Sequence, residues 1–276
     1  MATCSFSSAQ RMVADLSRLR PTATLIALVT LACGDSTGPA REETYEWSGN
    51  VAAGQVVEIK GINGAIRALP AAGDGVRVVA TKRGENDDPA SVRIDVVEHA
   101  GGVTVCAVYP DVPGQPANEC LPGEGGYLSA RETDVSVTFD VEVPEFAVLA
   151  ALTVNGEIKA NGLSQDVYAT TVNGNVDISA AGHAHGTTVN GNVNAALDRS
   201  AWERGLTFTT VNGNVTVRIP RDANLEVVGA TVNGSVATDF ALIISGDRRL
   251  MQGTLGSGGA LLTLSTVNGD VALRER

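Results

Sequence analysis

Two histidines stand close together in this 276-residue chain. His183 and His185 lie in the glycine-flanked stretch 182–186, where alternating side chains of a strand would point the same way. A zinc-type site needs a third or fourth ligand, and the sequence nominates none nearby. We therefore predict an exposed corner with no bound metal and no cofactor, although the two histidines leave metal binding open.

Two further patterns suggest chemistry that their surroundings do not support. Residues 34–38 (GDSTG) match the G-x-S-x-G nucleophile motif, which needs a strand before it and a helix after it. Here an apolar stretch precedes the motif and a polar tether follows it. The carboxylates of residues 84–89 lack the spacing and the glycine of a calcium-binding loop. We predict a solvated turn there and no catalytic residue in the chain.

The N-terminus predicts export. Three arginines precede an apolar core at residues 25–32, which is far shorter than the roughly 20 residues of a membrane-spanning helix. Residues 31–34 (LACG) resemble a bacterial lipobox, whose cysteine, here Cys33, becomes the lipidated first residue after cleavage. We predict a lipoprotein signal peptide at residues 1–32, with translation starting at Met1 or Met12. The alternatives are an ordinary cleaved signal or an irrelevant cysteine.

Residues 33–43 are polar, contain glycine and proline, and show no periodicity. They predict a flexible tether between a lipid at Cys33 and a folded domain at 44–276. The anchor would place this domain at the bacterial cell envelope, on the periplasmic face or the cell surface, and we expect the outer membrane.

Cys106 and Cys120 frame most of the irregular segment 106–129, which is rich in proline and glycine. In an exported protein such a pair predicts a disulfide. It would close its loop with a stabilisation of roughly 3 kcal/mol. Zinc is the weaker alternative, because the spacing is unlike a zinc pair and no second pair follows.

The charge excludes one class of partner. The formal net charge is −11, and removing residues 1–32 takes away three arginines and one aspartate, which leaves −13. A chain this acidic offers no basic surface for nucleic acid or anionic lipid. We predict no nucleic-acid partner; the excess of acid keeps the domain soluble.

One phrase, Thr-Val-Asn-Gly, occurs six times in the C-terminal half, each time followed by a polar residue and then valine or isoleucine. The copies begin at Thr153, Thr171, Thr188, Thr210, Thr231 and Thr266. A looser copy covers residues 61–66. Threonine and valine favour strands, and Asn-Gly readily accepts positive φ in tight turns. The predicted structural corners are Asn63, Gly64, Asn155, Gly156, Asn173, Gly174, Asn190, Gly191, Asn212, Gly213, Asn233, Gly234, Asn268 and Gly269.

The spacing of the copies favours a solenoid over a meander of hairpins. Successive copies start 18, 17, 22, 21 and 35 residues apart, whereas a meander would show turns roughly every 8–12 residues. One identical corner per coil of about 20 residues suits a β-helix. We expect each copy to stack on the one before, with valines pointing inward and asparagines hydrogen-bonded between coils.

The last interval is longer because residues 240–264 interrupt the array. They predict either a coil with a degraded corner or a looped-out hairpin. The charged residues 271–276 would then close the array with a polar end. Strict alternation over residues 134–144 marks the clearest strand outside the repeats.

Residues 44–276 resemble the adhesin-like DUF4097 family of β-strand repeats, also called toastrack domains. The recurrent Thr-Val-Asn-Gly-x-Val, the strand ending at Pro144 and the glycine-rich stretch 253–259 carry the resemblance. Residues 61–64 (GING) are similar to the related head-GIN domains. The resemblance implies a single-stranded right-handed β-helix on cell-envelope proteins, often near stress-response systems, and it implies no established activity.

These observations predict a non-catalytic cell-envelope lipoprotein, an adhesin-like binding or structural module. Threonine and asparagine ladders on its outer faces could contact glycan, peptidoglycan or an envelope protein. The alternative is an envelope-stress sensor or scaffold acting through protein–protein contacts. A glycan-active β-helix enzyme is disfavoured, because the outward positions lack convergent carboxylates.

Overall fold

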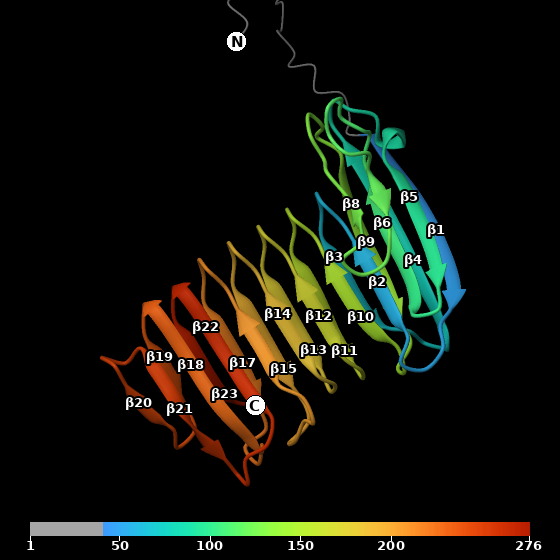
Figure 1. Cartoon of the computed structure of the whole chain (residues 1–276). Helices are drawn as coiled ribbons and strands as arrows, with labels where there is room; N and C mark the ends of the chain where they lie inside the picture. Colours follow the sequence, from blue (N-terminus) through green and yellow to red (C-terminus); the bar gives the residue numbers. More distant parts are fainter. Residues whose placement is uncertain (1–40) are drawn as a thin grey trace, which may run out of the picture. The chain divides into compact units, whose positions relative to one another are not determined.

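The computed structural model describes residues 41–276, which form one compact unit built almost wholly of β-strands (Figure 1). The only helical segment among them is the short 3-10 turn η1 (Pro89–Ser91). No helix in this part of the chain is long and apolar enough to cross a bilayer. The predicted signal peptide, Cys33 and the tether up to residue 40 lie outside the described residues.

Within residues 41–276 two long sheets pack against one shared core. In spatial order, sheet A contains β1 (Arg41–Asn50), β4 (Gly75–Gly84), β9 (Ser136–Val143), β3 (Ile66–Pro70), β11 (Ile158–Leu163), β13 (Val176–Ala180), β15 (Val193–Leu197), β17 (Val215–Ile219), β23 (Val271–Glu275) and β19 (Val236–Thr238). Sheet B contains β20 (Ile243–Ser245), β21 (Leu250–Leu255), β18 (Leu225–Asn233), β22 (Leu261–Asn268), β16 (Leu206–Thr209), β14 (Ala184–Thr187), β12 (Val167–Thr170), β10 (Val148–Leu152), β2 (Val56–Lys60), β6 (Gly102–Val108) and β5 (Arg93–His99). A small separate hairpin pairs β7 (Glu119–Cys120) with β8 (Gly126–Tyr127).

One coil consists of a strand of sheet B, a Thr-Val-Asn-Gly corner and a strand of sheet A. β12, the corner at 171–174 and β13 form such a coil, and β14 and β15 form the next. Neighbouring coils pair in parallel, residue for residue, in both sheets. Parallel pairing excludes the meander of hairpins and confirms the β-solenoid.

The alternation of side chains fills the core. The valine or isoleucine two places after each corner glycine points inward and is fully buried, as Val176 and Val193 show. On sheet B the inward positions carry residues such as Leu149, Val167 and Leu206. Like residues therefore stack along the array, because each coil repeats the pleat of its neighbour.

The order of the coils differs from the order of the sequence at the C-terminal end. β22 and β23 lie between the coil of β16 and β17 and the coil of β18 and β19. Figure 1 shows the red strand β22 beside β18. The expectation that each copy stacks on the one before is therefore wrong for the copy at Thr231, because the last copy, at Thr266, lies between it and the copy at Thr210. The charged residues 271–276 lie inside the array and do not close it.

The interruption before the last copy is a looped-out hairpin. β20 and β21 pair antiparallel with each other, and β21 continues antiparallel along β18. They form the C-terminal edge of sheet B, with Met251 and Leu255 buried against the core. This settles the two alternatives for residues 240–264 in favour of the hairpin.

The N-terminal end is also out of order. β2 and β3 form a coil that lies between the coil of β6 and β9 and the coil of β10 and β11. Antiparallel strands β1, β4 and β5 finish the two sheets at this end. β1 begins at Arg41, so residues 41–43 belong to a strand and the tether prediction was three residues too long.

Candidate functional site

The corner asparagines form a continuous ladder along one edge of the solenoid. In each coil the Nδ2 of asparagine donates to the Oδ1 of the asparagine in the neighbouring coil. The distances are 2.7 to 2.8 Å for the pairs Asn155–Asn63, Asn173–Asn155, Asn190–Asn173, Asn212–Asn190, Asn268–Asn212 and Asn233–Asn268. The predicted hydrogen bonding between asparagines is therefore present at every copy.

The corner glycines are required by close approach between coils. A Cβ on Gly191 would lie 2.0 Å from the carbonyl oxygen of Gly174, and a Cβ on Gly174 would lie 2.0 Å from that of Gly156. Asn190 is not among the described residues with positive φ. The expectation that asparagine needs this conformation was wrong; its side chain serves the ladder instead.

The threonine of each copy is buried, where the sequence predicted an outward ladder. Its Oγ1 donates to the carbonyl of the corner glycine in the neighbouring coil, at 2.9 Å from Thr171 to Gly156 and from Thr188 to Gly174. These bonds satisfy a carbonyl that the corner would otherwise leave buried without a partner. The threonine of each copy thus stabilises the corner from its buried side.

The valine within each Thr-Val-Asn-Gly copy points outward, so the expectation of inward valines holds only for the residue two places after each corner glycine. We call these side chains the valine row, which is 37% to 56% exposed. In order along the array it contains Val154, Val172, Val189, Val211, Val267 and Val232. The alternation of side chains along a strand explains this orientation. The threonine of each copy points inward, so the valine next to it points outward.

The outer face of sheet B carries two uncharged columns. One contains Tyr168, His185, Thr207 and Thr263, and the other contains Thr170, Thr187, Thr209 and Ser265. The Oγ1 atoms of Thr187 and Thr209 lie 3.2 Å apart. On a chain with a formal charge of −11, this is a flat surface of hydroxyl and ring groups.

His185 lies within the first of these columns, and His183 lies beside Tyr168. The ring of His183 lies 5.5 Å from that of Tyr168, and its Nε2 contacts the carbonyl oxygen of Gly205. The Nε2 of His185 lies 3.1 Å from Thr187 Oγ1. Burial lowers the pKa of His185, and the neighbouring charge of His183 lowers it further.

No third ligand completes a metal site there. Within residues 41–276 no group of three His, Cys, Asp or Glu side chains is placed to hold an ion. The nearby carboxylate, Asp166, pairs with Arg204 and accepts from the backbone N–H of His183. The hydrogen bonds and the ion pair of Asp166 therefore stabilise the corner that contains His183.

Cys106 and Cys120 are joined by a disulfide, with Cα atoms 5.8 Å apart. The segment between β6 and β9, residues 109–135, replaces the short corner of the other coils; we call it the cysteine-framed loop. Its first residue, Tyr109, donates from its OH to the carbonyl oxygen of Val135 at 3.1 Å. Burial raises the pKa of Tyr109 to about 12.

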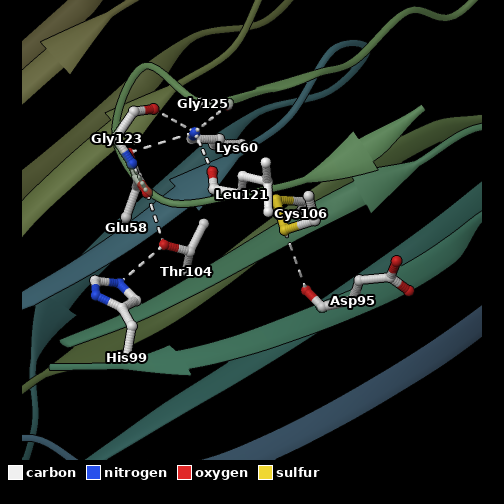
Figure 2. A network of polar contacts seen from close by, with 10 residues as sticks. Glu58, Lys60, Asp95, His99, Thr104, Cys106, Leu121, Gly123 and Gly125 are labelled. Carbon is white, nitrogen blue, oxygen red and sulfur yellow. Dashed lines mark hydrogen bonds and ion pairs between the residues drawn. A yellow bond between two sulfur atoms is a disulfide. The ribbon is translucent and has the colours of Figure 1, made fainter. Parts of the chain in front are cut away.

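A buried ion pair fastens this loop to the outer face of sheet B, as Figure 2 shows. Lys60 Nζ donates to the carbonyl oxygen of Leu121 at 2.6 Å and lies 3.7 Å from Glu58 Oε1. Glu58 Oε2 accepts from the backbone N–H of Gly123 at 3.0 Å. No sequence pattern predicts this contact, because Glu58 and Lys60 alternate with apolar residues like any solvent-facing pair.

A histidine, a hydroxyl and a carboxylate are connected in the same network (Figure 2). His99 Nδ1 accepts from the N–H of Gly101, and its Nε2 lies 3.3 Å from Thr104 Oγ1. Thr104 in turn donates to Glu58 at 2.7 Å. This chain of hydrogen-bonded groups resembles one in which a base activates a threonine hydroxyl as a nucleophile. Thr104 is fully buried, however, so no substrate can reach its hydroxyl.

A shallow hollow on the outer face of sheet A contains the other notable carboxylates. It encloses about 250 Å³ around Leu69, with Asp140 and Glu142 at its rim. Both carboxylates are about half exposed and pair with Arg67 and Arg77. Each carboxylate of this hollow thus lies in an exposed ion pair.

Sequence comparison identifies the family. The profile of the toastrack DUF4097 family matches residues 121–274, from the cysteine-framed loop to the last strand. The chain belongs to the toastrack family. The matched region contains all six Thr-Val-Asn-Gly corners, and Asn63 at the end of the asparagine ladder precedes it. No characterised protein matches the chain in sequence.

Comparison with solved structures finds matches of low identity and low TM-score. A candidate cell adhesion protein from Clostridium sporogenes is 12% identical, with 85% of this chain and 100% of that one covered and a TM-score of 0.46. A candidate adhesin from Bacteroides fragilis is 10% identical, with coverage of 85% and 97% and a TM-score of 0.32. A candidate lipid-binding protein from Parabacteroides distasonis is 13% identical, with coverage of 85% and 96% and a TM-score of 0.27. These values assign no function to the toastrack domain of this chain.

Proposed function

We propose that this toastrack protein is a non-catalytic binding module, anchored at the bacterial cell envelope through a lipid on Cys33. The observation that supports binding is the outer face of sheet B. Its uncharged columns of threonine, serine, tyrosine and histidine repeat with the coils, roughly 4.8 Å apart. Such a face suits an extended polar polymer that makes many weak contacts, and we propose an envelope glycan.

The arrangement of the polar groups supports a binding role over a catalytic one. The buried hydroxyl of Thr104 is inaccessible, and the carboxylates above Leu69 are paired with arginines. The hydroxyl groups of the two columns can both donate and accept hydrogen bonds, and they carry no charge. Tyr168 adds a ring on which a sugar can stack.

Binding and catalysis are separated by one experiment. The full chain is incubated with purified peptidoglycan sacculi, and both the bound fraction and the soluble products are measured. We expect binding without product. Replacing Thr187 and Thr209 by lysine should reduce binding severalfold, whereas Thr216→Lys, on the outer face of sheet A, should not. Equal binding by all variants contradicts the assignment to sheet B, and released saccharides contradict the non-catalytic role.

The anchor is tested by fractionation. Cys33→Ser should release the protein from the membrane fraction, because it removes the atom that would carry the lipid. Retention of this variant in the membrane, with residues 1–32 uncleaved, contradicts the lipoprotein proposal. Wild-type protein in the outer-membrane fraction is the result expected for the proposed location.

A second candidate function is scaffolding or stress sensing through protein–protein contact. The valine row favours it, because contiguous apolar side chains on a soluble surface mark interaction sites. Pull-down from envelope extracts with and without Val189→Lys distinguishes the two: a protein lost from the variant supports scaffolding, and an unchanged set of captured proteins contradicts it.

A further inference from the structure

The valine row is an apolar edge that lies outside the core. Its six side chains lie on adjacent coils, beside the asparagine ladder, and none contributes to the core. The corner itself is held by buried threonine, asparagine and glycine. Outward residues of a strand are free to be polar, yet all six copies carry valine.

An acidic segment lies beyond one end of the row, separated from Val154 by the coil of β2 and β3. The cysteine-framed loop connects β6 to β9, as the Thr-Val-Asn-Gly corners connect the strands of the other coils, so it lies on the same edge. Between residues 109 and 135 it has one basic residue, Arg131. Its five exposed carboxylates are Asp111, Glu119, Glu124, Glu132 and Asp134.

The other end of the row meets two arginines. The hairpin of β20 and β21 carries Arg248 and Arg249 at its turn, and both are exposed. Their carbonyl oxygens accept from the N–H groups of Val236 and Thr231, at 2.7 and 3.0 Å. These bonds fix the turn beside the corner of Val232, the last member of the row.

We propose that the valine row pairs two copies of this chain in antiparallel orientation about a two-fold axis. The axis would pass between Val189 and Val211, so that each of these faces the other in the second copy. The acidic loop of one copy then faces Arg248 and Arg249 of its partner, at both ends at once. Parallel pairing would bring acid to acid and base to base, which costs binding energy.

The charge distribution permits the contact. Residues 146–276, which carry the row, contain 9 Lys and Arg against 11 Asp and Glu, while residues 41–145 contain 8 against 18. Electrostatic repulsion between two copies is therefore small along the row. At the ends of the row the proposed pairing of opposite charges offsets it. Six half-exposed valines form less than the roughly 800 Å² per partner of a standard interface, so the pair should be weak in free solution.

Cross-linking of the purified full chain tests the orientation. Val154→Cys and Val232→Cys change opposite ends of the row, which lie roughly 24 Å apart for five coil spacings. With Cys4 and Cys33 replaced by serine in both variants, so that the introduced cysteine is the remaining free thiol, we expect mild oxidation to give covalent dimers when the two variants are mixed and none from either variant alone. Dimers from each variant alone would indicate parallel pairing and overturn the proposal, as would the absence of dimers in all three samples.

Sedimentation equilibrium tests the surface. The double variant Val189→Lys with Val211→Lys should raise the dissociation constant of the dimer at least tenfold, because each change occurs twice in a two-fold interface. Val228→Lys is the matched control, since Val228 is equally exposed but lies outside the row. A wild-type chain that stays monomeric at millimolar concentration, or equal dissociation constants for all variants, overturns the proposal whether or not the anchor is real.

Discussion

The Nδ2 of Asn268 lies 2.7 Å from the Oδ1 of Asn212, although 56 residues separate the two along the chain. The copy that comes between them in sequence, with Asn233, stacks on the far side of Asn268. The C-terminal strands β22 and β23 are thus inserted into an array whose neighbouring coils are already specified on both sides.

This insertion makes the end of the chain part of the core. Leu273→Ala in β23 should reduce the free energy of unfolding by about 2–5 kcal/mol, as for other buried leucines, because Leu273 is fully buried between two coils. A residue in a terminal coil would fray at little cost. Urea unfolding measures the change. Leu261→Ala is the control; Leu261 is 47% exposed in the same coil, and a similar loss there would contradict the argument.

The corners should tolerate loss of the asparagine better than loss of the glycine. Asn190→Ala removes two ladder hydrogen bonds, each of which contributes about 1 kcal/mol net. Gly191→Ala forces a Cβ to within 2.0 Å of a carbonyl oxygen in the next coil, so the coils must separate. Thermal unfolding should show the larger decrease for Gly191→Ala. Gly73→Ala, where a Cβ meets no atom within 4 Å, should leave the transition unchanged.

The repeats made much of this fold predictable. Spacing and composition were sufficient for the solenoid, its asparagine ladder and the disulfide, because these depend on local pattern. The coil order was not predictable, because Asn268 fits against Asn212 as well as against Asn190 or Asn233. Parallel strands with the same sequence pattern can pair with one another equally well, so the pattern does not determine which strands become neighbours.

The buried ion pair of Glu58 and Lys60 was not predictable from the sequence either. Their alternation with Val57 and Ile59 predicts a solvent-facing pair. The structure buries both under residues 121–125, some 60 positions further along the chain. Burial of this kind arises from a tertiary contact that no local window contains.

The ion pair should behave as a unit. Lys60→Met should destabilise the protein by about 3–5 kcal/mol, because it leaves Glu58 buried without its cation. Combining it with Glu58→Gln should recover much of that loss, because no uncompensated charge remains. Chemical unfolding of the two single variants and the double variant gives the coupling energy. Strict additivity would mean that the two side chains act separately.

The disulfide should stabilise the cysteine-framed loop more than the solenoid. Replacing Cys106 and Cys120 together by alanine removes a cross-link across 14 positions, worth about 3 kcal/mol on the loop-entropy model. We expect faster proteolytic cleavage within residues 110–129, while the ladders from β12 to β23 keep their amide protection in hydrogen exchange. Uniform loss of protection along the whole array would show that the loop nucleates the entire fold.

Stability should fall in mild acid because of His185. Burial and the charge of His183 lower the pKa of His185 below the ordinary value of 6.5, so the unfolded chain binds this proton more readily than the folded one. Stability is then fully present above pH 6.5 and decreases as the pH falls through 6.5 towards the folded-state pKa. His185→Gln, which cannot titrate, should flatten this part of the profile. Melting temperatures measured from pH 7.5 to 5 give the comparison; an unchanged slope in the variant would assign the acid sensitivity to other groups.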